Sequence, residues 1–154
     1  MAWLESTALA DWVRTSLVGY PLLLTGHSVG MAIMIGLVAV VDLRLIGLFR
    51  RIPYAALDRL ISIAWYGLIV NAVTGSMLFT SQAVAYVASP TYLLKMLMVL
   101  GGVLVAAYMQ PVLRREAANW TTDAALPQGM KPLAAVSLGM WLVAITTGRL
   151  TAYL

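Results

Sequence analysis

Four long stretches without a charged residue constrain this chain more than any other feature of its sequence. They cover residues 15–41, 60–94, 96–113 and 132–148. About 20 consecutive apolar residues suffice for a helix to cross the hydrocarbon core of a bilayer. Lipid offers no hydrogen bonds to backbone N–H and C=O groups, so each span must be helical. The sequence therefore predicts an all-α integral membrane protein.

The second stretch is too long for one helix, and the segment Ala88-Ser89-Pro90-Thr91 interrupts it near its end. Proline is tolerated in the first turn of a helix, so a new helix is expected to begin near Pro90. The four spans should form a four-helix bundle, a single domain over residues 1–154. We predict helices at about 17–47, 55–80, 90–113 and 132–153.

Ahead of the first span, residues 3–14 mix tryptophan and aliphatic residues with Glu5, Asp11 and Arg14. This pattern is typical of a short interfacial helix lying on the membrane surface. A frayed terminus with an aromatic anchor fits the pattern as well. No basic region and no small-residue cleavage site precede the apolar stretch, so a signal peptide is not expected.

Composition supports the membrane prediction and excludes several kinds of site. Apolar residues make up 62% of the chain and charged residues only 10%, whereas a soluble domain carries about 25% charged residues. The chain has no cysteine, which excludes disulfides, thiolate metal sites and cysteine nucleophiles. The net charge of +4 does not indicate nucleic acid, because the arginines lie beside the apolar spans.

The positive charges also predict an orientation. Seven lie on the side of the first and third connections between spans, and three lie toward the other side. The positive-inside rule then makes the first side cytoplasmic. We therefore expect a multi-pass protein of the bacterial inner membrane with both termini in the periplasm. The seven are Arg44, Arg50, Arg51, Arg59, Arg114, Arg115 and Lys131, and the three are Arg14, Lys95 and Arg149.

Polar residues inside the spans are few, and four of them fall at a similar depth. Counting 1.5 Å per residue from the outer end of each helix places His27, Asn71, Lys95 and Arg149 in the outer half of the bilayer. Ionisable groups inside a membrane are costly and mark candidate functional sites. This shared depth is the most informative feature of the sequence.

His27 is the only histidine of the chain, and it lies between Gly26 and Gly30. The two glycines can serve helix packing while the imidazole hydrogen-bonds across the bundle. Alternatively, His27 is an axial ligand to the iron of a b-type haem, because four-helix bundles build cofactor sites from facing side chains. A role in proton relay is the third interpretation.

A second axial ligand cannot be histidine. Met98 matches the depth of His27 best, although it also suits gap filling in the core. Lys95 can reach inward or extend to the outer interface, and a five-coordinate iron with His27 alone is a further alternative.

Other polar residues allow both a site role and a plain one. Arg149 can pair with a haem propionate or simply lie at the interface. Asn71 can hydrogen-bond His27 and fix its tautomer, or join two helices. Near the inner end of the first span, Asp42 and Arg44 are expected to pair with residues of other helices, for instance Asp42 with Arg59. We interpret that pair as structural.

Six segments of the chain carry a resemblance: Tyr20-Pro21, Gly26-His27-Ser28-Val29-Gly30, Val41-Asp42-Leu43-Arg44-Leu45-Ile46-Gly47, Thr74-Gly75-Ser76-Met77-Leu78-Phe79, Tyr92-Leu93-Leu94-Lys95 and Gly148-Arg149-Leu150-Thr151-Ala152-Tyr153. They resemble a family of uncharacterised four-helix bacterial inner-membrane proteins. A more distant similarity is to HemJ-type protoporphyrinogen oxidases and CopD-like copper-resistance membrane domains. In the HemJ type, an early histidine and a lysine that opens a later helix are implicated in haem binding, which His27 and Lys95 match in position. This chain has no other histidine.

Three functions remain open at this stage, and enzymatic activity is left undecided. The first is a haem-binding membrane subunit for electron transfer or porphyrin handling. The second is a non-catalytic accessory subunit of a larger respiratory or photosynthetic complex, or a homo-oligomer. The third is a carrier of protons or small solutes. No Ser-His-Asp arrangement and no zinc, calcium or iron–sulfur ligand pattern is present in the sequence.

Overall fold

The structure is a computed structural model that describes residues 1–116, 119 and 129–151. Every regular element in this part of the chain is helical, which confirms the predicted all-α class. Two short helices precede the first long one, and a short helix links the second and third long ones. In chain order the elements are α1 (Ala2–Glu5), α2 (Ala8–Thr15), α3 (Gly19–Ile46), the 3₁₀ helix η1 (Tyr54–Ala56), α4 (Leu57–Ser81), α5 (Ala83–Ala88), α6 (Pro90–Glu116) and α7 (Met130–Leu150).

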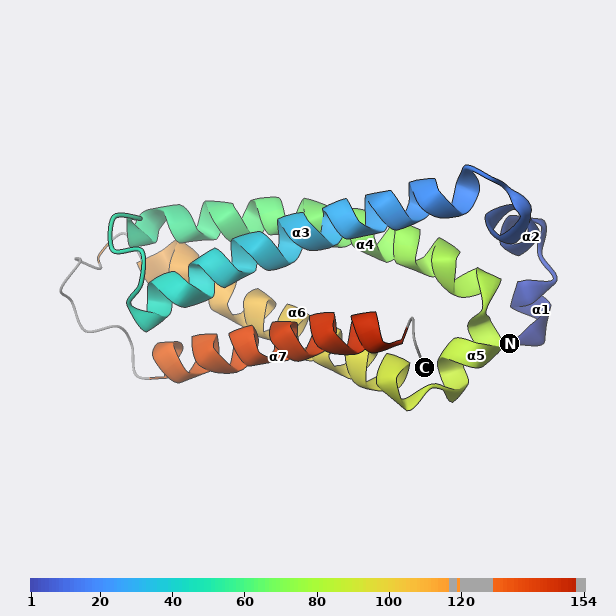
Figure 1. The fold of residues 1–154 in the computed structure, drawn as a ribbon. Coiled ribbons are helices and arrows are strands. Elements are labelled where there is room, and N and C mark those ends of the chain that lie inside the picture. Colours follow the sequence, from blue (N-terminus) through green and yellow to red (C-terminus); the bar gives the residue numbers. More distant parts are fainter. Residues whose placement is uncertain (117–118, 120–128, 152–154) are drawn as a thin grey trace.

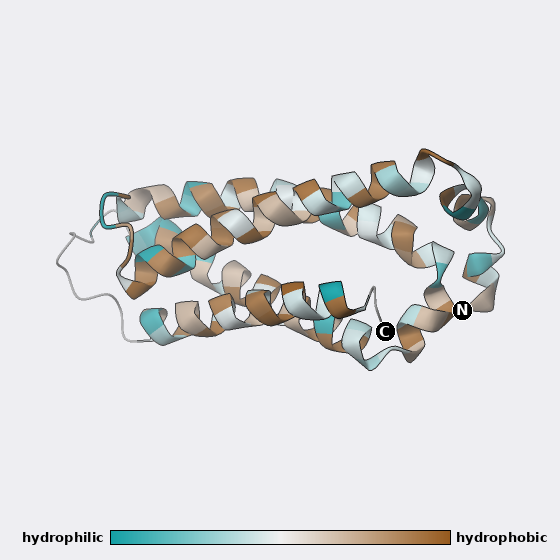
Figure 2. Ribbon diagram, in the orientation of Figure 1, coloured by the Kyte–Doolittle hydropathy of each residue, from teal (hydrophilic) through white to brown (hydrophobic). Residues whose placement is uncertain are grey.

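Four of these helices are long and apolar enough to cross a membrane, and the protein is a multi-pass membrane protein. The candidate spans are residues 19–46, 54–81, 90–116 and 130–150. Most of each span is not buried inside the bundle, so its apolar side chains are available to face lipid. Hydrophobic colours predominate along the four long helices, as Figure 2 shows. The predicted spans begin and end within three residues of helices α3, α4, α6 and α7.

The long helices form two antiparallel pairs, α3 with α4 and α6 with α7. The pairs are joined mainly by the contact of α3 with α7, and more weakly by that of α4 with α6. In Figure 1 the two pairs lie close together where α3 ends, and their ribbons diverge toward α5. The end of α3 and the start of α4 lie at the same end of the bundle as the end of α6 and the start of α7.

The N-terminal region is two short helices rather than one, and it is fixed to the corner between α4 and α5. The hydroxyl of Thr7 accepts a hydrogen bond from Ala10 N–H and caps α2. Glu5 accepts a hydrogen bond of 2.9 Å from Val84 N–H. Arg14 donates to the backbone oxygens of Glu5 and Ser81. Polar groups of this region therefore pair with backbone at the ends of α4 and α5.

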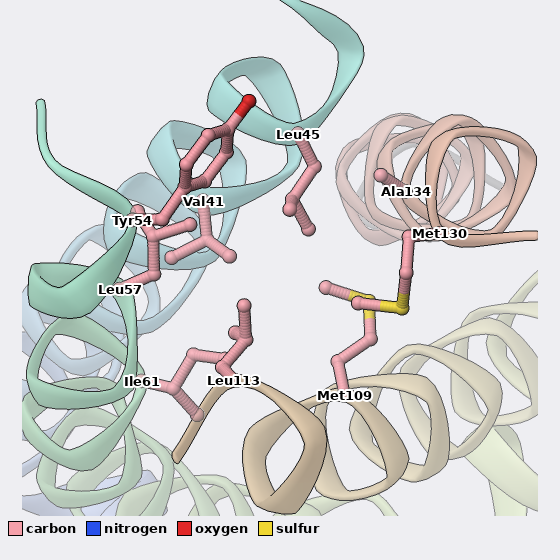
Figure 3. Close-up of a cluster of buried hydrophobic side chains, with 9 residues drawn as sticks. All are labelled: Val41, Leu45, Tyr54, Leu57, Ile61, Met109, Leu113, Met130 and Ala134. Carbon is pink, nitrogen blue, oxygen red and sulfur yellow. The ribbon is translucent and has the colours of Figure 1, made fainter. Parts of the chain in front are cut away.

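The larger apolar core (Figure 3) lies toward the end of the bundle where α3 ends and the helix pairs are close. We call this half of the bundle the inner half and the half toward α5 the outer half. All four long helices contribute to the larger core. A second, smaller core lies next to it along α3 and consists of Met34, Val38, Ala64 and Trp141. The larger core consists of Val41, Leu45, Tyr54, Leu57, Ile61, Met109, Leu113, Met130 and Ala134.

Polar side chains join α4 to α6 near the same end. Arg114 and Asp58 form a salt bridge of 3.3 Å. The Gln110 amide donates to Asp58 and Ser62 and accepts a 2.7 Å bond from the Trp65 indole. This network includes the only salt bridge among the described residues.

The predicted pairing of Asp42 with Arg59 is wrong. Arg59 is exposed, and Asp42 is buried with no ion-pair partner in the described ranges. The two residues share an end of the bundle, but α3 and α4 turn these side chains in different directions. Position along the helices was therefore a poor guide to pairing.

Helices α3 and α4 approach most closely where Gly30 faces Gly67. A Cβ atom on Gly30 would lie 2.8 Å from the backbone oxygen of Gly67, and one on Gly67 would lie 2.8 Å from the backbone oxygen of Gly30. Such distances are available only to glycine. The two positions therefore set the spacing of the pair.

We expect Gly30→Ala to destabilise the protein by about 1–3 kcal/mol, because the new methyl group forces α3 and α4 apart. Gly36→Ala in the same helix is the matched control, since a Cβ there would meet nothing within 4 Å. The control should be neutral or more stable by about 0.5–1 kcal/mol. Unfolding by titration with a denaturing detergent measures both, and equal effects would contradict the close contact.

Candidate functional site

His27 and Asn71 exchange hydrogen bonds between α3 and α4. The imidazole Nδ1 lies 3.1 Å from the backbone oxygen of Asn71, and the Asn71 amide donates a 2.9 Å bond to the backbone oxygen of His27. Each side chain thus bonds to the backbone of the other residue. The Asn71 side chain therefore joins α3 to α4, and the imidazole lies against the backbone oxygen of Asn71 rather than its side chain.

This arrangement determines which imidazole nitrogen carries the proton. A carbonyl oxygen only accepts hydrogen bonds, so Nδ1 must be the donor to Asn71. The hydroxyl of Thr74 lies 3.3 Å from the same nitrogen and donates its own proton to backbone oxygens of α4. In neutral His27 the proton is therefore on Nδ1, and Nε2 keeps a free lone pair. Within the described residues, Nε2 has no hydrogen-bond partner.

Gly75 gives the ring its place beside α4. A Cβ atom at this position would lie 2.9 Å from Cε1 of His27 and 3.2 Å from Nδ1. Any other residue would push the imidazole away from the Asn71 oxygen. Gly75 thus acts as a positioning residue for His27, a role that spacing in the sequence did not reveal.

A cavity of about 30 Å³ lies beside His27. All four long helices line it, and Lys95 of α6 and Trp141 of α7 are among the lining residues. One water molecule needs about 10–15 Å³ of such space, so the cavity holds about two. The full lining is His27, Met31, Met34, Ile35, Leu68, Asn71, Lys95, Val99, Trp141 and Ala144.

Lys95 turns toward this cavity rather than away from the bundle. Its aliphatic part passes Gly148 of α7, where a Cβ atom would lie 3.5 Å from Cδ and Cε. Its Nζ lies 5.9 Å from the ring centre of Tyr92. No acidic side chain pairs with it in the described part of the chain. Two nitrogen groups therefore share one apolar cavity without a carboxylate.

The other predicted site residues lie elsewhere. Met98 is partly buried but does not line the cavity, which its neighbour Val99 does. Arg149 is exposed and forms no ion pair with the described residues. The structure thus brings together His27, Asn71 and Lys95 from the predicted set and leaves Met98 and Arg149 outside. Tyr153, part of the resembling C-terminal segment, lies outside the described residues.

Three stacked aromatic rings close the bundle near α5. The ring centres of Tyr86 and Tyr92 are 4.9 Å apart, and that of Phe79 is 5.9 Å from Tyr92. Burial raises the pKa of the Tyr86 hydroxyl above its ordinary value, and the nearby Tyr20 adds to the shift. The stack holds α4, α5 and α6 together at the end where the helix pairs diverge.

His27 is suited to bind iron, but the cavity beside it is too small for a porphyrin ring. A histidine that binds a metal through one ring nitrogen usually donates the N–H of the other to a carbonyl or carboxylate, as Nδ1 does here. Sites for ligands of drug size or larger span roughly 300–1,000 Å³, well above the cavity of about 30 Å³. A haem could bind His27 only if the two helix pairs moved apart around it.

Comparisons with known proteins do not identify this site. No protein-family model, curated protein or solved structure matches the chain. Among the described residues, no group of three or more His, Cys, Asp or Glu side chains could hold a metal ion.

The hydrogen bond from Nδ1 can be tested directly, because His27 is the only histidine of the chain. We expect ¹⁵N NMR of histidine-labelled protein at alkaline pH to show a protonated Nδ1 and an unprotonated Nε2. Asn71→Leu should weaken this preference by disturbing the α3–α4 contact. A neutral ring with its proton on Nε2 would contradict the arrangement.

Proposed function

We propose that this protein is a membrane subunit that binds a b-type haem through Nε2 of His27, for electron transfer or porphyrin handling. The observation that carries the proposal is the bond from Nδ1 of His27 to the Asn71 oxygen. It leaves Nε2 unpartnered beside a cavity that Lys95 also lines. When bound, a haem would supply a one-electron iron centre.

Lys95 is the proposed second residue of the site. It lines the cavity from the helix pair opposite His27, so the two side chains can hold a flat ligand between the pairs. In its neutral form Lys95 can bind iron, and in its charged form it can pair with a propionate. Met98 and Arg149 would join only after α6 and α7 had moved.

The distribution of contacts between the helix pairs supports ligand binding in the outer half. The larger core binds the pairs together in the inner half, whereas contact between α4 and α6 is weak along the bundle. A ligand that separates the outer halves would disturb the smaller core around Met34 and Trp141 and the contact of Phe79 with Tyr92.

One observation favours a second function. The cavity has room only for water-sized molecules, which suits a non-catalytic accessory subunit that packs in a larger membrane complex or as a homo-oligomer. In that case the His27–Asn71 exchange would serve helix packing alone. A colourless protein that co-purifies with other membrane subunits is the expected result for this function.

The haem proposal predicts a coloured protein. Protein purified from haem-replete cells should show a Soret absorption band, which His27→Ala should abolish because the iron ligand is lost. Lys95→Met should change the position or intensity of the band, whereas Lys131→Met should not, since Lys131 is exposed at the start of α7. A folded, colourless wild-type protein would contradict the proposal.

We also propose that the protein lies in a bacterial inner membrane with both termini outside the cytoplasm, as the charge distribution indicates. The absence of cysteine allows a clean test. A membrane-impermeant maleimide should label intact cells carrying Leu17→Cys, between α2 and α3, but not those carrying Leu48→Cys, beyond α3. Both positions are exposed. The reverse labelling pattern would overturn this orientation.

A further inference from the structure

Asp42 is a buried acid that neither the fold nor the proposed haem site uses. It lies near the inner end of α3, and its side chain is fully buried. Neither carboxyl oxygen has a hydrogen-bond partner in the described part of the chain. Buried polar groups in folded proteins almost always find a partner, so these two oxygens need an explanation.

Ser137 of α7 faces this carboxyl across the contact between the helix pairs. Its hydroxyl lies near the Asp42 carboxyl, but no hydrogen bond joins the two side chains. Ser137 is also fully buried, and its oxygen likewise lacks a hydrogen-bond partner among the described residues. Two polar groups with unused bonding capacity therefore meet in an apolar interior.

No neighbouring cation neutralises Asp42. On its own helix, Arg44 donates to the Ile52 oxygen at 2.6 Å and to the Tyr54 hydroxyl at 3.1 Å. The charged groups on the packed elements are engaged or exposed: on α4, Asp58 binds Arg114 of α6 and Arg59 faces outward, and on α7 Lys131 is exposed. None of them forms an ion pair with Asp42 in the described ranges.

A proton suits this site better than a divalent metal ion. A carboxylate buried without compensation costs several kcal/mol, so the ionised form is strongly disfavoured. Calcium and magnesium need about six or more oxygen ligands, and the described residues hold no group of three or more His, Cys, Asp or Glu side chains. A proton needs no such set of ligands, because it binds covalently to one carboxyl oxygen and removes the charge.

We infer that Asp42 is a proton-binding site, a neutral carboxylic acid buried at the contact of α3 with α7. The bound proton removes the charge and so allows α7 to pack against α3, which is the main contact between the helix pairs. Trp141 lies one turn beyond Ser137 and lines the cavity beside His27. Release of the proton would place a charge in the α3–α7 contact, which would loosen that contact and the cavity beside His27. The inference does not depend on haem binding.

Infrared spectroscopy of protein labelled with ¹³C-aspartate tests the inference, because a protonated carboxyl has a carbonyl band distinct from that of a carboxylate. At neutral pH the wild type should show the isotope-shifted band of a protonated acid, and Asp42→Asn should lack it. Asp58→Asn is the matched control and should retain the band, since Asp58 is the partner of Arg114.

A folded wild type without this band at neutral pH would overturn the inference, as would a band that persists in Asp42→Asn. If Asp42→Asn does not fold, the triple variant Asp11→Asn, Asp58→Asn, Asp123→Asn leaves Asp42 as the only aspartate. The folded triple variant should then show only the carbonyl band of a protonated aspartic acid. A carboxylate band alone in its spectrum would equally overturn the inference.

Discussion

The close contact of α3 with α4 is the interaction on which the candidate site depends. Gly30 and Gly67 let the two backbones approach, and only at that separation can His27 and Asn71 reach each other's carbonyl oxygens. This exchange of hydrogen bonds satisfies polar groups that lipid could not satisfy. It also fixes the imidazole ring through its Nδ1 atom. A packing contact between small residues thus determines which imidazole nitrogen is free for chemistry.

The bundle divides its interior into two unlike halves. The inner half is closed by a large apolar core and by the network of Asp58, Gln110 and Arg114. The outer half holds the cavity with His27 and Lys95, and there the helix pairs diverge. Asp42 lies in the tight inner half at the contact between pairs. A change of charge there would therefore reach the looser half through α7.

The sequence predicts those features that depend on hydrophobicity and on depth in the membrane. The spans follow from charge-free runs, and the meeting of His27, Asn71 and Lys95 follows from their shared depth. The rotation of each helix about its own axis decides which side chains face the interior. Packing between helices sets that rotation, and the spacing of residues in one sequence does not reveal it. For that reason Val99 rather than Met98 faces the cavity, Trp141 was missed, and Asp42 does not pair with Arg59.

The central claim is that His27 presents a free Nε2 to a ligand held between the two helix pairs. An experimental structure of protein purified from haem-replete cells tests it most directly. The account predicts a planar ligand bonded to Nε2, with α6 and α7 displaced from α3 and α4 at the outer end. Helices packed as described here, with only water in the cavity beside His27, would contradict it.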